Sequence, residues 1–156
     1  MPVVADDLNQ VFDAIIGRKV GSKPLVIPAA AFWKESGAAA FSAGQWVGAG
    51  IFECDLGLPP GTLIESIVWG YNRGGAGTVS LELLATNPIA PSYTSIIGSP
   101  IAAGTGNTTT TITAAAIEAA SPGKSVIAAS TGYSIEIQHT NAANVFSGLV
   151  ITTRLQ

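Results

Sequence analysis

Apolar and polar residues alternate along residues 62–71 and again along residues 79–86, in the middle of the chain. A period of two is the signature of a β-strand with one buried face. In the first segment, Glu65, Trp69 and Tyr71 fall on the same side of the strand. The glycine-rich segment between the two can supply the positive φ angles that a hairpin loop requires. We therefore expect a central β-hairpin, around which the other strands pack.

Strand-like patterns also precede and follow the expected hairpin. The predicted strands cover residues 24–32, 46–56, 108–117, 131–140 and 145–155, with shorter candidates at 93–97 and 125–129. Residues 33–45 are expected to form a loop and residues 88–108 a long connection, and residues 114–120 are open to a helical turn. Pro28 places the first strand at an edge or a bulge, because proline cannot donate to the ladder.

The count is seven to nine short strands with turn signals between them. Such spacing favours an all-β fold, an antiparallel β-sandwich or jelly roll. The gaps between the strands contain no helical crossover pattern, which an α/β fold requires. The predicted fold class is thus an antiparallel β-sandwich or jelly roll preceded by a short N-terminal α-helix.

The helix is expected over residues 6–16, where apolar residues recur with the spacing of one helix face. Its apolar stripe consists of Leu8, Val11, Phe12, Ile15 and Ile16. A helix of about three turns is marginal by itself in water, so the stripe must pack against something. It packs either on its own domain or on another molecule, and the polar connector 17–23 favours the second. We expect residues 1–23 to form an anchoring helix with its connector, and residues 24–156 to form the β-sandwich domain.

Composition bears on the partners. Of the 156 residues, only 11% are charged, where roughly 25% is usual. A small domain with so few charges has little to keep it apart from its neighbours. We therefore expect a homotrimer, whose subunits cover much of each other's surface. The net charge of -3 argues against binding to nucleic acid, which needs a basic patch. The sequence contains neither a secretory signal pattern nor an apolar run long enough for membrane insertion, so we expect synthesis in the cytoplasm.

Candidate catalytic chemistry is sparse. His139 is the only histidine and lies on the apolar face of its predicted strand, so a structural role is expected. Cys54 alternates with Phe52 and Leu56, which predicts a buried and unreactive thiol. No spacing of Cys, His or acidic residues matches a metal site. We expect no catalytic residue, no metal and no cofactor.

The glutamates Glu65, Glu82 and Glu136 each lie within a predicted strand. A glycosidase needs two carboxylates that flank the scissile bond, at separations of roughly 5 to 9.5 Å. Nothing in the sequence brings two of these glutamates together. We expect them to face solvent or a subunit interface, and we expect that the protein is not an enzyme.

Aromatic residues are the remaining candidates for a site, because aromatic platforms bind sugars or partner proteins and also fill cores. The candidate interface or ligand aromatics are Trp33, Trp46, Trp69 and Tyr71. For Trp69 and Tyr71, which share a strand face, the sequence leaves core and subunit interface equally open.

Short segments of the chain resemble structural proteins of tailed bacteriophages. Residues 5–17 (ADDLNQVFDAIIG) resemble their N-terminal anchoring helices. Residues 27–32 (IPAAAF), 58–65 (LPPGTLIE) and 148–153 (GLVITT) resemble the jelly-roll-like head domain of phage fibre and decoration proteins. This chain departs from that pattern at its close, where the family has a tyrosine. The resemblance implies a trimeric and non-enzymatic virion component, located on the head or on the tail.

Two functions are therefore expected to compete. The first is a virion structural protein, a capsid decoration or short fibre, which contacts itself and other capsid or tail proteins. The alternative is a carbohydrate- or receptor-binding module of the same fold, which uses loop aromatics to hold a glycan on the host surface.

Overall fold

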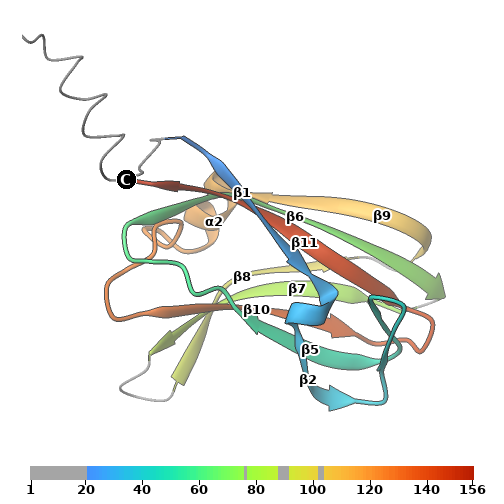
Figure 1. Ribbon diagram of the computed structural model, residues 1–156. Helices are drawn as coiled ribbons and strands as arrows, with labels where there is room; N and C mark the ends of the chain where they lie inside the picture. Colours follow the sequence, from blue (N-terminus) through green and yellow to red (C-terminus); the bar gives the residue numbers. More distant parts are fainter. Residues whose placement is uncertain (1–20, 76, 88–91, 102–103) are drawn as a thin grey trace, which may run out of the picture.

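The computed structural model describes residues 21–75, 77–87, 92–101 and 104–156 (Figure 1). These residues form eleven strands, one α-helix and one short 3-10 helix. The strands build two antiparallel sheets that lie face to face, with sheet A above sheet B in Figure 1. The predicted β-sandwich is thereby confirmed, whereas the expected N-terminal helix and its stripe (Leu8, Val11, Phe12, Ile15 and Ile16) lie outside the described residues.

Sheet A has six strands. They are β3 (Ala40–Ser42), β4 (Gln45–Val47), β11 (Val145–Leu155), β6 (Thr62–Gly75) and β9 (Gly104–Thr113) in spatial order, with β1 (Lys23–Pro28) paired to β11. Strand β1 pairs with no other strand among the described residues, so Pro24 and Pro28 lie on an edge strand, as the proline pattern predicts.

Sheet B has five strands. They are β2 (Trp33–Gly37), β5 (Gly50–Asp55), β10 (Gly132–His139), β7 (Val79–Asn87) and β8 (Ser92–Ile101) in spatial order. The 3-10 helix η1 (Ala29–Ala31) leads from β1 of sheet A to β2 of sheet B. The helix α2 (Ala114–Ala120) follows β9, where Thr113 Oγ1 accepts a hydrogen bond from the backbone N–H of Ala116.

The core lies between the sheets and is filled by the inward residue of each alternating pair. Its largest fully buried side chains are Trp69, Phe52, Phe146, Ile64, Ile67, Leu81, Leu83, Ile117, Ile135, Ile137, Ile151 and Val79. Phe32 and Phe146 meet edge to face, with ring centroids 4.9 Å apart. Burial of this apolar surface from both sheets is the main stabilising contribution to the fold.

The expected central hairpin is wrong. Strand β6 lies in sheet A between β11 and β9, whereas β7 lies in sheet B between β10 and β8. The glycines of the connection are needed for close packing rather than for positive φ. A Cβ on Gly74 would clash with the Cβ of Ala143, and one on Gly77 would clash with the Cβ of Asn141. Alternation predicted both strands, but it does not specify which strand pairs with which.

The expected side of Glu65 is also wrong. The register of β6 against β11 shifts between Thr152 and Thr153, so Glu65 is an extra residue in β6. The bulge turns Glu65 outward while Ile64 and Ile67 both face the core. There the Glu65 carboxylate forms an ion pair with Arg154, with Nε and Oε1 3.2 Å apart.

Several element boundaries differ from expectation. The loop expected at residues 33–45 contains β2, β3 and the first residue of β4. The strand expected at 46–56 divides at Gly48, whose φ of 112° lets the chain pass from sheet A to sheet B. Most of the connection expected at 88–108 belongs to β8 and β9. The short strand expected at 125–129 is reduced to one bridge, between Val126 and Leu63.

Candidate functional site

The structure places two of the four candidate aromatics, Trp69 and Tyr71, in the core. Both are buried, their ring centroids lie 4.6 Å apart, and the Tyr71 hydroxyl is 3.3 Å from Thr110 Oγ1. Both rings contribute to packing between the sheets. Tyr71 also belongs to the lining of the groove described below, whereas Trp69 does not.

The other two candidate aromatics differ from each other. Trp46 is half-buried and stacks on Phe52 at 4.8 Å, and its indole N–H donates to the carbonyl of Ala29 over 3.0 Å. Trp33 lies on the edge strand β2 and is 46% exposed. Trp33 is therefore the one of the four that is free to meet a ligand.

Trp33 stands at the end of a row of carboxylates on the outer face of sheet B. In the strand register Trp33 is paired with Glu53, Glu53 with Glu136, and Glu136 with Glu82. Directly paired residues project from the same face of a sheet, and neighbouring strands are about 4.8 Å apart. Glu53, Glu136 and Glu82, here called the carboxylate row, thus lie side by side. The expectation that no two glutamates come together was wrong.

Burial and mutual repulsion act on the middle member of the row. The pKa of Glu136 is raised by burial first, and then by the negative charges of Glu82, Glu35 and Glu53. Like charges that face each other across a sheet are destabilising. The fold therefore carries this arrangement at a cost to its own stability.

The other end of the row meets the β7–β8 hairpin. Ser95 Oγ donates to Glu82 Oε1 over 2.5 Å, which places Ser95 on the outer face of sheet B. Tyr93 lies two residues earlier in the same strand, so it projects from the same face, and it is 75% exposed. The register of the hairpin shifts between Leu83 and Leu84. In Figure 1 its far end turns away from sheet A, on the side of this outer face.

We call this surface the glutamate face: Trp33, Glu53, Glu136, Glu82, Ser95 and Tyr93. Its carboxylates are hydrogen-bond acceptors, and its two aromatic rings offer flat apolar surface, Trp33 beside Glu53 and Tyr93 opposite Thr86. The carboxylates project side by side from one sheet and do not flank a bond from two sides, which glycoside hydrolysis requires. The arrangement suits the binding of a ligand rich in hydroxyl groups.

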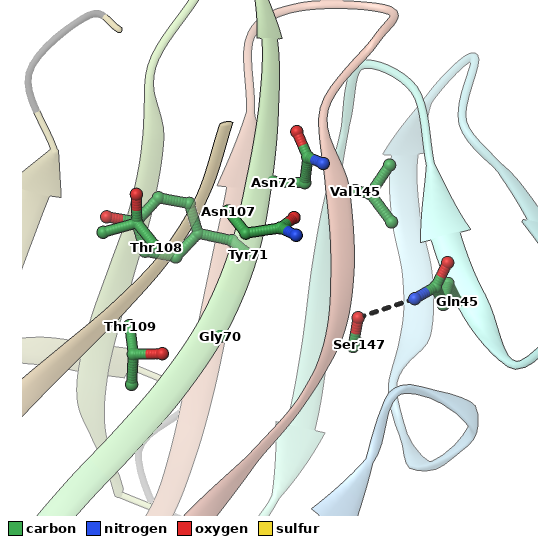
Figure 2. Close-up of a pocket in the computed structure, with 9 residues that line it drawn as sticks. All are labelled: Gln45, Gly70, Tyr71, Asn72, Asn107, Thr108, Thr109, Val145 and Ser147. Atoms are coloured by element: carbon green, nitrogen blue, oxygen red, sulfur yellow. Dashed lines mark hydrogen bonds between the residues drawn. The ribbon is translucent and has the colours of Figure 1, made fainter. Parts of the chain in front are cut away.

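A second polar feature lies on the outer face of sheet A. It is a groove of about 440 Å³, lined by Gln45, Gly70, Tyr71, Asn72, Asn107, Thr108, Thr109, Val145 and Ser147 (Figure 2). In Figure 2, Gly70 lies on the strand through the middle, with the β9 residues on one side and those of β11 and β4 on the other. Gln45 Nε2 donates to Ser147 Oγ over 2.8 Å. No lining residue is charged.

The two residues with catalytic potential in the sequence are both buried. His139 is 3% exposed, and its Nδ1 lies 3.0 Å from the carbonyl oxygen of Gly48. Burial lowers the pKa of His139, whereas the bond to Gly48 raises it. Burial also raises the pKa of the Cys54 thiol, as do Asp55 and Glu53. Across the described part of the chain, no three His, Cys, Asp or Glu residues are grouped so that they could hold a metal ion.

Comparison with known proteins gives similarity only at the level of the fold. No protein-family model and no curated protein matches the chain. A solved variant of a family 29 carbohydrate-binding module is 13% identical, with a TM-score of 0.51 over 85% of this chain and 92% of that one. A xylan-binding module of family 15 is 17% identical, with a TM-score of 0.51 over 87% and 99%. The chain thus has the jelly-roll sandwich fold of these modules.

No helix in the described ranges is both long and apolar enough to span a membrane.

The sequence did not predict either of the two polar surfaces, the glutamate face or the groove. The sequence contained one signal of the glutamate face, since Glu53, Glu82 and Glu136 each occupy an outward position within an alternating strand. The sequence contained a weaker signal of the groove, which is the glycine at position 70 within a run of larger strand residues.

Proposed function

We propose that the protein is a non-enzymatic glycan-binding module that holds a neutral polysaccharide chain against the glutamate face. One observation carries the proposal: the exposed ring of Trp33 stands at one end of a continuous row of carboxylates, and the exposed ring of Tyr93 projects from the same sheet face, four residues along the strands from the other end. This was the alternative function in the sequence analysis. The aromatic that supports it is Trp33, now joined by Tyr93.

The charge of the face selects among glycans. Carboxylates accept hydrogen bonds from sugar hydroxyl groups, and such charge-assisted bonds are roughly twice as strong as neutral ones. An acidic sugar would meet the repulsion of Glu53, Glu136 and Glu82 at once. The ligand class is therefore a neutral, hydroxyl-rich chain.

The size of the face also suits a chain rather than a single sugar. Trp33 and Glu82 lie on strands separated by three spacings, or about 14 Å across the sheet. Tyr93 lies on the next strand, paired with Thr86, four residues along β7 from Glu82. The solved modules with this fold include one described as xylan-binding. That likeness supports the proposal only through the shared sandwich, since the identities are low.

Two single variants test the proposal. Trp33→Ala and Tyr93→Ala should each weaken binding to neutral xylo-, cello- or manno-oligosaccharides by about tenfold or more, because exposed aromatic anchors dominate such contacts. Phe41→Ala is the matched control, since Phe41 is similarly exposed but lies in sheet A. Calorimetric titration of the intact protein measures the affinities. If all three variants bind as the wild type does, the glutamate face is not the site.

We propose, as a second candidate, that the module is carried on a phage particle as a homotrimer. The observation that favours it is an apolar row on the outer face of sheet A. Val26 is paired with Val150 and Val150 with Val68, and Val26 is 69% exposed. With only 11% charged residues, such a row is a candidate contact between subunits.

The trimer has its own test. Light scattering of the full chain should give the mass of three subunits, and Val26→Asp should reduce it to that of one. A monomer at micromolar concentration would refute the trimer. The virion location, the contacts with capsid or tail proteins and a host glycan as ligand stay predictions. Both proposed functions are compatible in one protein, since they use different sheets.

A further inference from the structure

We infer that the groove on the outer face of sheet A is a second binding site, for a neutral saccharide held by hydrogen bonds. This site lies on the opposite side of the sandwich from the glutamate face. It does not depend on the proposed function of that face, so each site can fail separately.

The floor of the groove is made by a glycine that the fold does not need. A Cβ added at Gly70 would have no atom within 4 Å, and its φ is not in the left-handed region. Glycine weakens the interior of a strand, where it commonly marks a bulge or the close approach of a ligand. The bulge of β6 lies at Glu65, away from the groove, whereas the bulge of β11, at Ser147, lies directly opposite Tyr71 and Gly70. The open space above Gly70 leaves room for a ligand to approach the backbone there.

The neighbouring glycine in the same row has a structural reason. Gly148 is paired with Gly70, has a φ of 127°, and a Cβ there would lie 2.6 Å from the carbonyl oxygen of Ile27. Gly148 does not line the groove. The lining residues come from β9, β6, β11 and β4, which are neighbours in that order, so the groove runs across the strands rather than along them.

The walls of the groove present neutral donors and acceptors. Asn72 and Asn107 are direct cross-strand partners, and neither amide has a protein partner among the described residues. Ser147 Oγ accepts from Gln45 Nε2, so the Ser147 hydroxyl proton stays available to a ligand. Thr109 adds another hydroxyl from β9.

The composition of the walls determines the ligand class. An ionic ligand would find no countercharge, because the lining residues carry none. Amides and hydroxyls that both donate and accept match a ligand whose groups also do both, as sugar hydroxyls do. The partly exposed Val145 is the only aliphatic side chain in the lining, so the site depends on hydrogen bonds. We therefore expect weaker binding here than at the glutamate face.

The test combines two variants that each disable one site. Gly70→Val fills the groove with a β-branched side chain that a strand accepts, so the melting temperature should not fall. Trp33→Ala removes an aromatic from the glutamate face. Thr111→Val is the matched control, because Thr111 is exposed on the same face of β9 but does not line the groove. The probes are neutral xylo-, cello- and manno-oligosaccharides, with oligogalacturonate as the acidic comparison.

Residual binding of a neutral probe by the Trp33→Ala protein should fall by about tenfold or more when Gly70→Val is added. It should not change when Thr111→Val is added. If Gly70→Val has no effect in that background, or if Trp33→Ala alone abolishes all binding, the groove is not a saccharide site. If Gly70→Val alone abolishes binding while Trp33→Ala does not, the groove stands and the glutamate face fails. If the protein binds oligogalacturonate and Gly70→Val abolishes that binding, the inference that the groove takes a neutral ligand is wrong.

Discussion

Replacement of Glu136 by glutamine should stabilise the protein at neutral pH. Glu136 is half-buried and directly paired with Glu53 on one side and Glu82 on the other. Glutamine keeps the shape of the side chain and removes the charge. The variant therefore relieves two cross-strand repulsions without opening a cavity.

The size of the effect follows from the two pairs. A directly opposed charge pair in a sheet is worth roughly 0.2–1 kcal/mol. Because the row is open to solvent on its outer side, screening keeps each pair toward the lower end of that range. Two pairs then sum to about 0.5 kcal/mol, which corresponds to about 1–2 °C in Tm for a chain of this length. Glutamine also removes the cost of burying the Glu136 charge, which further favours the stability of the variant.

The pH dependence has a definite sign. The pKa of Glu136 in the fold is raised above the value of about 4.3 in the unfolded chain. Below both values the group is neutral in either state and costs nothing. As the pH rises through the unfolded pKa toward the folded one, the native state loses stability. The advantage of Glu136→Gln should therefore be present near neutral pH and vanish in acid below the unfolded pKa.

These effects are measured by thermal unfolding followed by circular dichroism. The measurement is made near neutral pH and in acid below the unfolded pKa of Glu136, each in low and high salt. Glu65→Gln is the matched control, because Glu65 is paired with Arg154 and not with another carboxylate. It should leave the Tm unchanged or lower it slightly. A Glu136→Gln protein that is no more stable than the wild type near neutral pH would refute the reasoning. So would a gain that is equally large in acid.

Three further predictions concern packing and organisation. Cys54 should react slowly with a thiol reagent in the native protein, and rapid labelling would contradict its inward register. Gly74→Ala should destabilise the fold by roughly 1–3 kcal/mol in denaturant titrations, because its Cβ would meet Ala143. Gly70→Ala should not destabilise the fold, because the new methyl group would have open space around it. Deletion of residues 1–23 should leave the Tm of the sandwich nearly unchanged while abolishing attachment to a particle, and an unfolded product would show that the segment belongs to the core.

The sequence predicted strands and their faces well where the alternation is uninterrupted. In β10 the inward set of Tyr133, Ile135, Ile137 and His139 was expected and is buried. The same reasoning failed at Glu65, because one extra residue in a strand reverses every face beyond it. A bulge of this kind leaves no trace in the polar pattern of a single sequence.

The sequence did not predict which strands pair with which. Strands β6 and β7 are neighbours in the chain, yet each bonds to strands far away in sequence, and both choices bury the same apolar faces. The carboxylate row depends on those partners, since Glu53, Glu136 and Glu82 meet only when β5, β10 and β7 are adjacent. The sequence shows where each glutamate lies in its strand, but it does not show that the three glutamates lie next to one another.

The most direct test of the glutamate face uses the indole N–H signals of the three tryptophans in a ¹H–¹⁵N NMR spectrum. Trp33 is exposed, Trp46 is half-buried with its N–H bonded to Ala29, and Trp69 lies in the core. Titration with a neutral oligosaccharide should shift the Trp33 signal, assigned by its loss in Trp33→Ala, and leave the Trp69 signal in place. Binding that leaves the Trp33 signal unchanged at saturation would contradict the account.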